Sequence, residues 1–279
     1  MANVPVQPIL AAPLFARVYE AHFDLLRGLT PEQWLLPTAC EGWTVKDVAL
    51  HMLSDDIGWL SSGRDHFGER PNRAIDDWDD LVKWIDMRNE VWIRATRRMS
   101  TRLLVALAPI IGRWLLSFVD SLDPFAPGPV ISWASDDPAP MWMQIGRELT
   151  ERWMHHQHIC DAVGVESLKD AEVVHAVLDM FVRALPYTYR RIEALDGSVI
   201  TLWLIGDGGG SWSLLRWDDQ WRLLAVTDLP PTCTVTLPVD TAWRLFTKGI
   251  TSEQARREAI IEGDAALAEP LLHMVSIIA

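Results

Sequence analysis

The chain has 279 residues, of which 49% are hydrophobic and 23% charged, and its formal net charge is −13. This composition is typical of a folded globular protein and excludes a largely disordered chain. The negative charge repels phosphates and anionic lipids, so we expect neither nucleic acid nor a membrane as a partner.

The length favours two domains, because single hydrophobic cores stop growing below this size. The cysteines are Cys40, Cys160 and Cys233, an odd number without a CxxC pair, which argues against a disulfide framework. The first residues, Met-Ala-Asn-Val-Pro, lack the basic and apolar regions of a signal peptide. We therefore expect a cytoplasmic protein. Whether it is a monomer or a homodimer stays open.

Apolar residues recur at helical spacing through most of the first half of the chain. Thr44-Val-Lys-Asp47 is typical of a capping box with Asp in place of Glu. Residues 103–119 are the most apolar stretch, but Pro109, Gly112 and Arg113 interrupt them, which favours a buried helix pair or a kinked helix over a membrane span. The predicted helices are 8–28, a short one from Thr30, 44–63, 78–99, 103–119 and 140–163, the last capped by Gly164.

Prolines and small residues between 120 and 140 predict a long loop, of the kind that forms lids or binding segments. After a predicted helix at 171–191 the pattern changes to short strands. Gly206–Gly210 leads from one strand into another, which indicates a hairpin and not a phosphate-binding loop. The predicted strands are 198–205, 211–217, 221–226 and 233–237, followed by helices at 241–246, 253–262 and 265–274.

These elements predict an α+β protein: an N-terminal bundle of four or five helices, residues 1–165, followed by a small α+β domain with an antiparallel sheet, residues 166–279.

Candidate metal ligands lie on one face of the helix predicted at 140–163. At 100° per residue, Glu148, Glu151, His155 and His158 fall within a sector of about 80°. A carboxylate and an imidazole one turn apart can bind Zn²⁺, Ni²⁺ or Fe²⁺, but a third ligand must come from elsewhere.

His51, in the middle of the helix predicted at 44–63, is the candidate third ligand, and His22 and His66 are alternatives. Asp47 and Asp55, each one turn from His51, are candidates to orient its second ring nitrogen. The same spacings also fit ordinary hydrogen-bonded histidines and solvated helix charges.

Other nucleophiles have little support in the sequence. There is no GxSxG motif, and adjacent acidic pairs diverge on a helix. Cys40 and Cys160 have no base nearby in sequence, so we interpret them as structural thiols.

Two segments resemble a known family. Trp34, the run Pro37-Thr-Ala-Cys-Glu-Gly-Trp-Thr-Val-Lys-Asp47 and then His51 are similar to the N-terminal motif of the mycothiol-dependent maleylpyruvate isomerase family, and Gly146-Arg-Glu-Leu-Thr-Glu-Arg-Trp-Met-His-His-Gln157 is similar to its second motif. The resemblance implies a DinB-like helical bundle in which His51, Glu151 and His155 bind a metal. His158 stands where the family motif often has Asp, which leaves an extra ligand or a base open.

The C-terminal segments 240–249 and 261–267 are similar to the sterol-carrier-like domain that accompanies the bundle in this family. Whether that domain binds substrate or an apolar ligand stays open.

The resemblance implies a metal-dependent and thiol-dependent isomerase or transferase acting on a small molecule. Its cofactors would be a divalent metal, Zn²⁺ before Ni²⁺ or Fe²⁺, and mycothiol or another low-molecular-weight thiol. The thiol would add to the double bond of an unsaturated dicarboxylate, and its elimination after rotation would give the isomer. An anionic substrate needs cationic partners, and the candidates are Arg244, Lys248, Arg147 and Arg152.

Two alternatives remain: a hydrolase or transferase that uses the same metal without a thiol, and a non-catalytic protein that binds a metal and a ligand. A metal whose fourth position is closed, for instance by His158, would favour the non-catalytic protein.

Overall fold

The computed structural model describes residues 3–68 and 77–277, in which helices and strands divide between two compact units. The bundle unit comprises Ala12–Leu122 and Glu151–Leu168, and the sheet unit comprises Met1–Ala11, Asp123–Thr150 and Lys169–Ala279. Together they form the predicted α+β protein. The boundary predicted at 165/166 stays a prediction, because α5 (Met141–Val163) contributes residues to both units.

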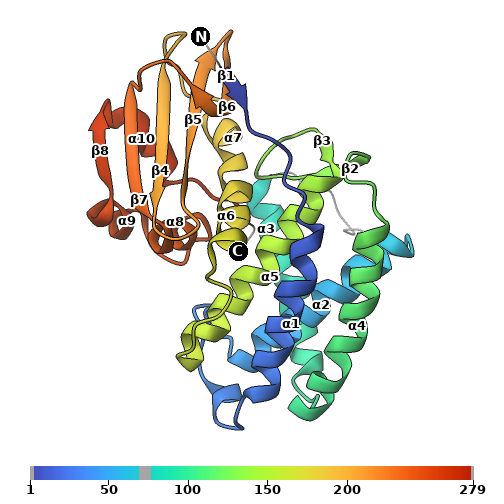
Figure 1. Cartoon of the computed structure of the whole chain (residues 1–279). Coiled ribbons are helices and arrows are strands. Elements are labelled where there is room, and N and C mark those ends of the chain that lie inside the picture. Colours follow the sequence, from blue (N-terminus) through green and yellow to red (C-terminus); the bar gives the residue numbers. More distant parts are fainter. Residues whose placement is uncertain (1–2, 69–76, 278–279) are drawn as a thin grey trace. The chain divides into compact units, whose positions relative to one another are not determined.

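The bundle unit consists of α1, α2, α3, α4 and the second half of α5 (Figure 1). Its core forms where the apolar faces of these helices meet, as their periodicity predicts. Fully buried side chains include Phe15, Leu53, Leu115 and Trp153. The helices have the bounds α1 (Ala12–Gly28), α2 (Val45–Trp59), α3 (Trp78–Thr96) and α4 (Thr101–Ser121).

α2 begins as the sequence predicts. The side chain of Thr44 accepts a hydrogen bond from the backbone N–H of Asp47, and the Asp47 carboxylate accepts one from the backbone N–H of Thr44, which confirms the capping box. The short helix predicted from Thr30 is a single 3-10 turn, Gln33–Leu35, and a π-helical turn, Leu60–Arg64, follows α2. Gly164, with φ of +71°, follows α5 in the left-handed conformation that suits a helix C-terminus.

α4 is continuous through Pro109. Within the described part of the chain it is the one helix that is long and apolar enough to cross a membrane, judged by length and composition alone. A core helix of a globular protein meets the same criterion, and Leu104, Leu115 and Val119 of α4 are buried.

The sheet unit contains a six-stranded sheet in the order β1-β6-β5-β4-β7-β8. Neighbouring strands are antiparallel, except that β4 and β7 pair in parallel, with Ile200 opposite Cys233. Residue periodicity does not encode the direction of a neighbouring strand, so this pair was not predictable. The strands are β1 (Asn3–Pro5), β4 (Val199–Ile205), β5 (Gly210–Trp217), β6 (Gln220–Thr227), β7 (Cys233–Pro238) and β8 (Ile260–Gly263).

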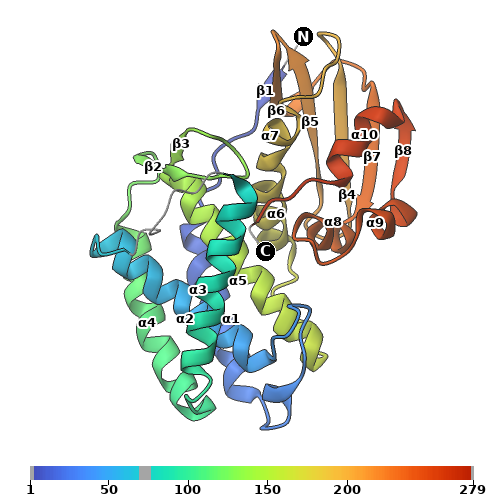
Figure 2. The same ribbon diagram turned by 180° about the vertical axis from the view of Figure 1, so that it is seen from behind.

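Helices α7 and α10 lie against one face of this sheet, in front of it in Figure 2. The predicted hairpin is confirmed, because β4 and β5 pair directly across the glycine-rich turn. The helix predicted at 171–191 is broken by a 3-10 turn, Val182–Ala184, just before Pro186 at the start of the next helix. The helices are α6 (Ala171–Phe181), α7 (Leu185–Tyr189), α8 (Val239–Phe246), α9 (Ser252–Glu258) and α10 (Ala265–Leu272).

Two predictions in this unit are wrong. The helix predicted at 253–262 stops at Glu258, because Ile260 and Ile261 pair with Thr236 and Val235 as an edge strand that suits β-branched residues. The loop predicted at 120–140 contains a two-stranded ribbon, β2 (Pro127–Val130) with β3 (Pro138–Pro140).

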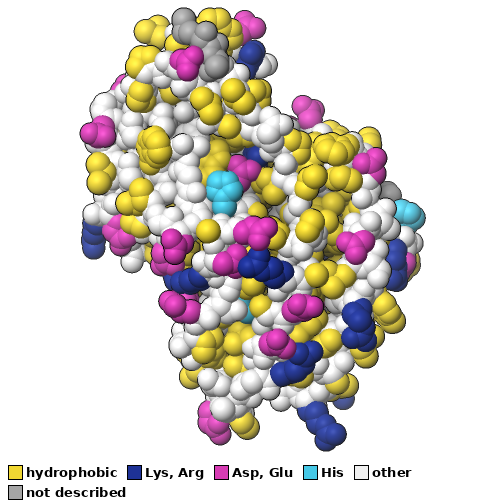
Figure 3. Space-filling model, viewed as in Figure 1, with side chains coloured by type: hydrophobic (Ala, Val, Ile, Leu, Met, Phe, Trp, Pro, Cys, Tyr) yellow, Lys and Arg dark blue, Asp and Glu magenta, His cyan; other side chains and the backbone are white. Residues whose placement is uncertain are grey.

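Charged side chains of both signs are interspersed on the face drawn in Figure 3, among scattered exposed hydrophobic side chains. The net negative charge of the chain is therefore not gathered there into one acidic surface.

Two histidines lie together in the core of the bundle unit. His22 on α1 and His156 on α5 are 3% and 0% exposed, with ring centroids 5.9 Å apart. Neither ring nitrogen of His156, nor Nδ1 of His22, has a hydrogen-bond partner among the described residues. Burial lowers the pKa of His156 to about 4 and holds the pKa of His22 well below its usual range.

We expect these imidazoles to destabilise the bundle in acid. In the unfolded chain the histidines bind protons below about pH 6.5, whereas His156 in the folded protein stays neutral down to about pH 4. The free energy of unfolding therefore decreases as the pH falls through this window. For His156 the loss between pH 7 and pH 5 is about 2 kcal/mol. Urea unfolding at both pH values should show a smaller loss for His156→Leu than for the wild type, and an unchanged loss for exposed His273→Leu. Equal acid sensitivity of wild type and His156→Leu would contradict this account.

A buried ion pair lies on the adjacent part of α5. Arg152, 1% exposed, donates to Asp56 on α2 at 2.7 Å and to the Tyr19 hydroxyl at 2.7 Å, and Tyr19 also donates to Asp56. The guanidinium of Arg152 also lies 5.7 Å from the centroid of the Phe15 ring. This arrangement ties α1, α2 and α5 together through one desolvated charge.

Asp56→Asn should destabilise the protein by about 3–5 kcal/mol, because it leaves the Arg152 charge buried without a counter-charge. The double variant Asp56→Leu with Arg152→Met should recover most of that loss, since it removes both charges. Chemical denaturation measures both, with Asp24→Asn at the exposed Asp24–Arg27 pair as the control that changes little. A loss for Asp56→Asn no larger than for the control would contradict a structural role.

Candidate metal centre

Three of the predicted ligand side chains meet within the bundle unit. His51 comes from the middle of α2, and Glu151 and His155 come from adjacent turns of α5. Nε2 of His155 lies 3.0 Å from Oε1 of Glu151, and Nε2 of His51 lies 3.4 Å from the same oxygen. One donor atom from each residue lies within 4.8 Å of the other two. Sequence spacing alone could bring together only the two on α5.

The cluster is largely shielded from solvent. The side chains of His51 and His155 are 6% and 7% exposed, and that of Glu151 is 20% exposed. The indole of Trp43 lies 5.1 Å from the His51 ring, centroid to centroid, and restricts its orientation. Of the three ligand side chains, that of Glu151 is the most exposed.

The donor set fits a divalent cation. Burial raises the pKa of Glu151, but hydrogen bonds and the charges of His155 and His51 outweigh this and leave the pKa below its usual range. Burial alone lowers the pKa of His155, and contacts with Cys40 and Glu151 reverse this and raise it to about 10. The carboxylate is ionised and only partly solvated, so a positive charge beside it stabilises it, and a proton on a histidine or a metal ion can provide that charge.

The other predicted candidates lie elsewhere. His22 packs beside His156, His66 is exposed with φ of +56°, and Glu148 contacts Gln144 and Arg147. None of them belongs to a group of close metal donors among the described residues.

The predicted supporting roles of Asp47 and Asp55 are wrong. Asp47 caps α2 and pairs with Arg97 at 2.9 Å. Asp55 approaches Nε2 of His51 at 3.3 Å, which is the nitrogen that faces Glu151. Nδ1 of His51 is buried and has no partner among the described residues, so neither aspartate orients it.

Cys40 joins the site from the loop before α2. The backbone N–H of Trp43 donates to the carbonyl of Cys40 at 3.0 Å and closes a turn. Gly42 has φ of +76° within it, where a side chain would be strained. Thr38 closes the base of the loop by donating to the carbonyl of Trp43 at 3.0 Å. The loop thus fixes the position of the Cys40 thiol.

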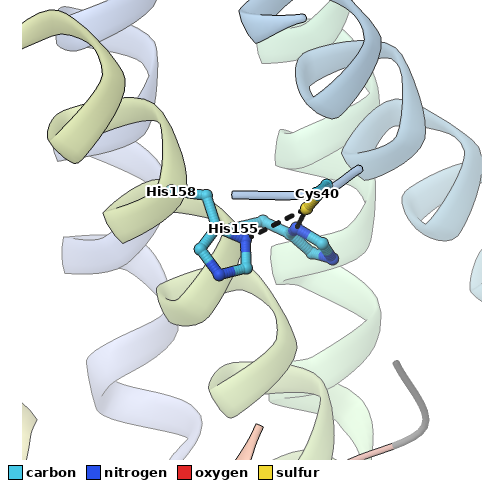
Figure 4. Close-up of side chains that lie close together, drawn as sticks. All are labelled: Cys40, His155 and His158. Carbon is cyan, nitrogen blue, oxygen red and sulfur yellow. Dashed lines mark hydrogen bonds between the residues drawn. The ribbon is translucent and has the colours of Figure 1, made fainter. Parts of the chain in front are cut away.

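The Cys40 thiol lies between two histidines of α5. Its Sγ is 3.2 Å from Nδ1 of His158 and 3.9 Å from Nδ1 of His155 (Figure 4). Burial raises the pKa of Cys40, but hydrogen bonds to His155 and then His158 outweigh it and lower the pKa to about 5. The interpretation of Cys40 as a structural thiol overlooked these bases, because they are more than a hundred residues away in sequence. Its place in the same motif as His51 was the available signal.

The candidate cations for an anionic substrate are engaged in ion pairs where the structure describes their partners. Arg152 is buried against Asp56, which corrects its interpretation as a substrate-binding residue. Arg147 pairs with Glu148, and Arg244 pairs with Asp240 at 2.9 Å. Lys248 has φ of +59° after α8, and a role for Arg244 or Lys248 toward substrate stays a prediction.

We expect His51→Ala and His155→Ala each to lose the cation of the three-ligand centre and to keep most of their helical content. Two remaining donors hold a divalent cation far less tightly than three. Zinc content after dialysis, measured by mass spectrometry, and far-ultraviolet circular dichroism test this, with His273→Ala as a control on an exposed histidine. Full zinc content in both variants would show that the centre is elsewhere.

The family model described as the mycothiol maleylpyruvate isomerase N-terminal domain matches residues 15–160. A crystal structure of a histidine-to-alanine mutant of mycothiol-dependent maleylpyruvate isomerase is similar to the chain, with a TM-score of 0.54 and 10% identity over 92% of this chain and 93% of that one. A second crystal structure of mycothiol-dependent maleylpyruvate isomerase has a TM-score of 0.52 and 12% identity, over 86% of this chain and 88% of that one.

At these identities the two crystal structures support the fold alone. The search of curated proteins gave no match. Because the family model covers more than half of its length, the chain belongs to the mycothiol maleylpyruvate isomerase family.

Proposed function

We propose that this protein is a metal-dependent and thiol-dependent isomerase or transferase that acts on a small molecule. The meeting of His51, Glu151 and His155 in one partly open cluster is the observation that carries the proposal. The family name adds support for a thiol-dependent isomerase as the general class.

The donor chemistry favours zinc over magnesium or calcium, because two of the three ligand atoms are imidazole nitrogens. Three protein ligands leave one coordination position of a bound zinc ion open for a thiol or a water molecule. The zinc would supply the Lewis acidity that stabilises a thiolate or a water-derived hydroxide at neutral pH.

The residues of the chain have separate tasks in this proposal. His51, Glu151 and His155 hold the cation, and the carboxylate of Glu151 offsets part of its charge. Trp43 packs beside the His51 ring and helps to hold its orientation. Nδ1 of His158 faces Cys40 at 3.2 Å, which supports a centre whose fourth position His158 leaves open. An open position favours catalysis over a purely structural metal.

The reaction class that the family name suggests needs no oxidant. A thiol adds to a conjugated double bond, the former double bond rotates as a single bond, and loss of the thiol restores the double bond in the other geometry. No electrons are gained or lost overall, so the protein has to bind, orient and exchange protons with its two substrates.

We expect the zinc-loaded protein to isomerise maleylpyruvate only when mycothiol or another small thiol is added. His51→Ala should lower the rate at least about a hundredfold, as expected when a cation that stabilises developing charge is lost. Nuclear magnetic resonance of the substrate reports the isomer directly, and His273→Ala is the matched control. Turnover that is independent of thiol would overturn the thiol-dependent class and favour the hydrolase or transferase alternative.

A further inference from the structure

A second group of metal-binding atoms lies beside the first. It consists of Sγ of Cys40 and ring nitrogens of His155 and His158, which all lie within 4.8 Å of one another. Figure 4 shows the thiol directed toward both rings, which come from adjacent turns of α5. The side chains of His155 and His158 are buried, and Cys40 is half-buried. A sulfur and two imidazoles are a donor set that selects zinc over magnesium or calcium.

The separations within this group suit one tetrahedral ion. Zinc bonds of about 2.3 Å to sulfur and about 2.0–2.1 Å to nitrogen place S and N about 3.5 Å apart at tetrahedral angles. The observed Sγ–Nδ1 distances of 3.2 Å to His158 and 3.9 Å to His155 fall on either side of that value. Small side-chain rotations would make both distances fit, while the turn at Gly42 keeps the Cys40 backbone in place.

His155 belongs to both groups through different atoms. Its Nε2 faces Glu151 at 3.0 Å, and its Nδ1 faces Cys40 at 3.9 Å. One imidazole can therefore face a cation on each side. We propose that Cys40, Nδ1 of His155 and Nδ1 of His158 bind a second zinc-class divalent cation, next to the one held by His51, Glu151 and Nε2 of His155.

The charges and protons balance in this arrangement. Binding of the second cation displaces the remaining ring proton of His155, and any proton still on the Cys40 sulfur, to solvent. The thiolate, the doubly bound imidazolate and the Glu151 carboxylate then offer three negative charges to the two cations. No oxidation or reduction is involved. The second position rests on the proposed function only through the shared ring of His155.

The experiment uses the full chain, freed of metal with a chelator and reloaded separately with Zn²⁺ and Co²⁺. The wild type should bind two Zn²⁺ per chain, and its Co²⁺ form should show sulfur-to-cobalt charge-transfer absorption. Cys40→Ser and His158→Ala should each bind one Zn²⁺ and lose that absorption, with circular dichroism unchanged. Cys160→Ala is the matched control, because Cys160 lies on α5 with His155 and His158 but belongs to neither group of metal-binding atoms. This variant should keep both ions.

The His51→Ala variant separates this inference from the proposed function. It should lose one Zn²⁺ and keep the sulfur-to-cobalt absorption. The second position would be overturned if the wild type bound one Zn²⁺, showed no sulfur-to-cobalt absorption and lost its ion in His51→Ala. That result would leave the three-ligand centre intact. One ion that Cys40→Ser loses and His51→Ala retains would support the Cys40 position and overturn the centre on which the proposed function rests.

Discussion

The contact between the Glu151 carboxylate and the His155 imidazole, one turn apart on α5, is the interaction on which the site depends. A carboxylate this poorly solvated needs a compensating positive charge, and the ring of His155 is placed to carry a proton or to share a cation with it. His51 completes the set only because α2 packs against α5 with that part of its surface buried. The packing of the bundle therefore determines the chemistry of the site.

α5 carries this chemistry at a structural cost. An apolar face alone would suffice to pack a helix, yet buried positions of α5 include Arg152, His156 and Gln157. Successive residues point about 100° apart, so Arg152 and His156 face away from the direction of Glu151 and His155. Arg152 is stabilised by Asp56 and Tyr19, whereas the ring nitrogens of His156 have no hydrogen-bond partner among the described residues, and its pKa is lowered to about 4. One side of the helix thus holds the site, and another holds a buried charge that fixes neighbouring helices.

Local signals in the sequence were enough to predict much of this. The capping box at Thr44 placed the start of α2, and the four-residue spacing of Glu151 and His155 placed both on one face of α5. The family resemblance then selected His51 from three candidate histidines. What could not be predicted depends on partners distant in the chain: the Asp56 that neutralises Arg152, and the parallel pairing of β4 with β7. In both cases the spacing of residues along the sequence indicates which face of a helix or strand is buried. It does not indicate which residues lie opposite that face.

Cys40 shows how far that limit reaches. Its thiol is an ordinary small side chain when only its sequence neighbours are considered, and one with a lowered pKa once α5 places His155 and His158 against it. The loop that holds it is rigid for local reasons, since Thr38, the Cys40–Trp43 hydrogen bond and Gly42 fix its shape. The same short segment between the 3-10 turn and α2 therefore supplies Trp43 to restrain His51 and Cys40 to contact His155. His51 on α2 and His155 on α5 belong to the same set of metal ligands. A substitution in this loop would therefore disturb the metal centre through both helices.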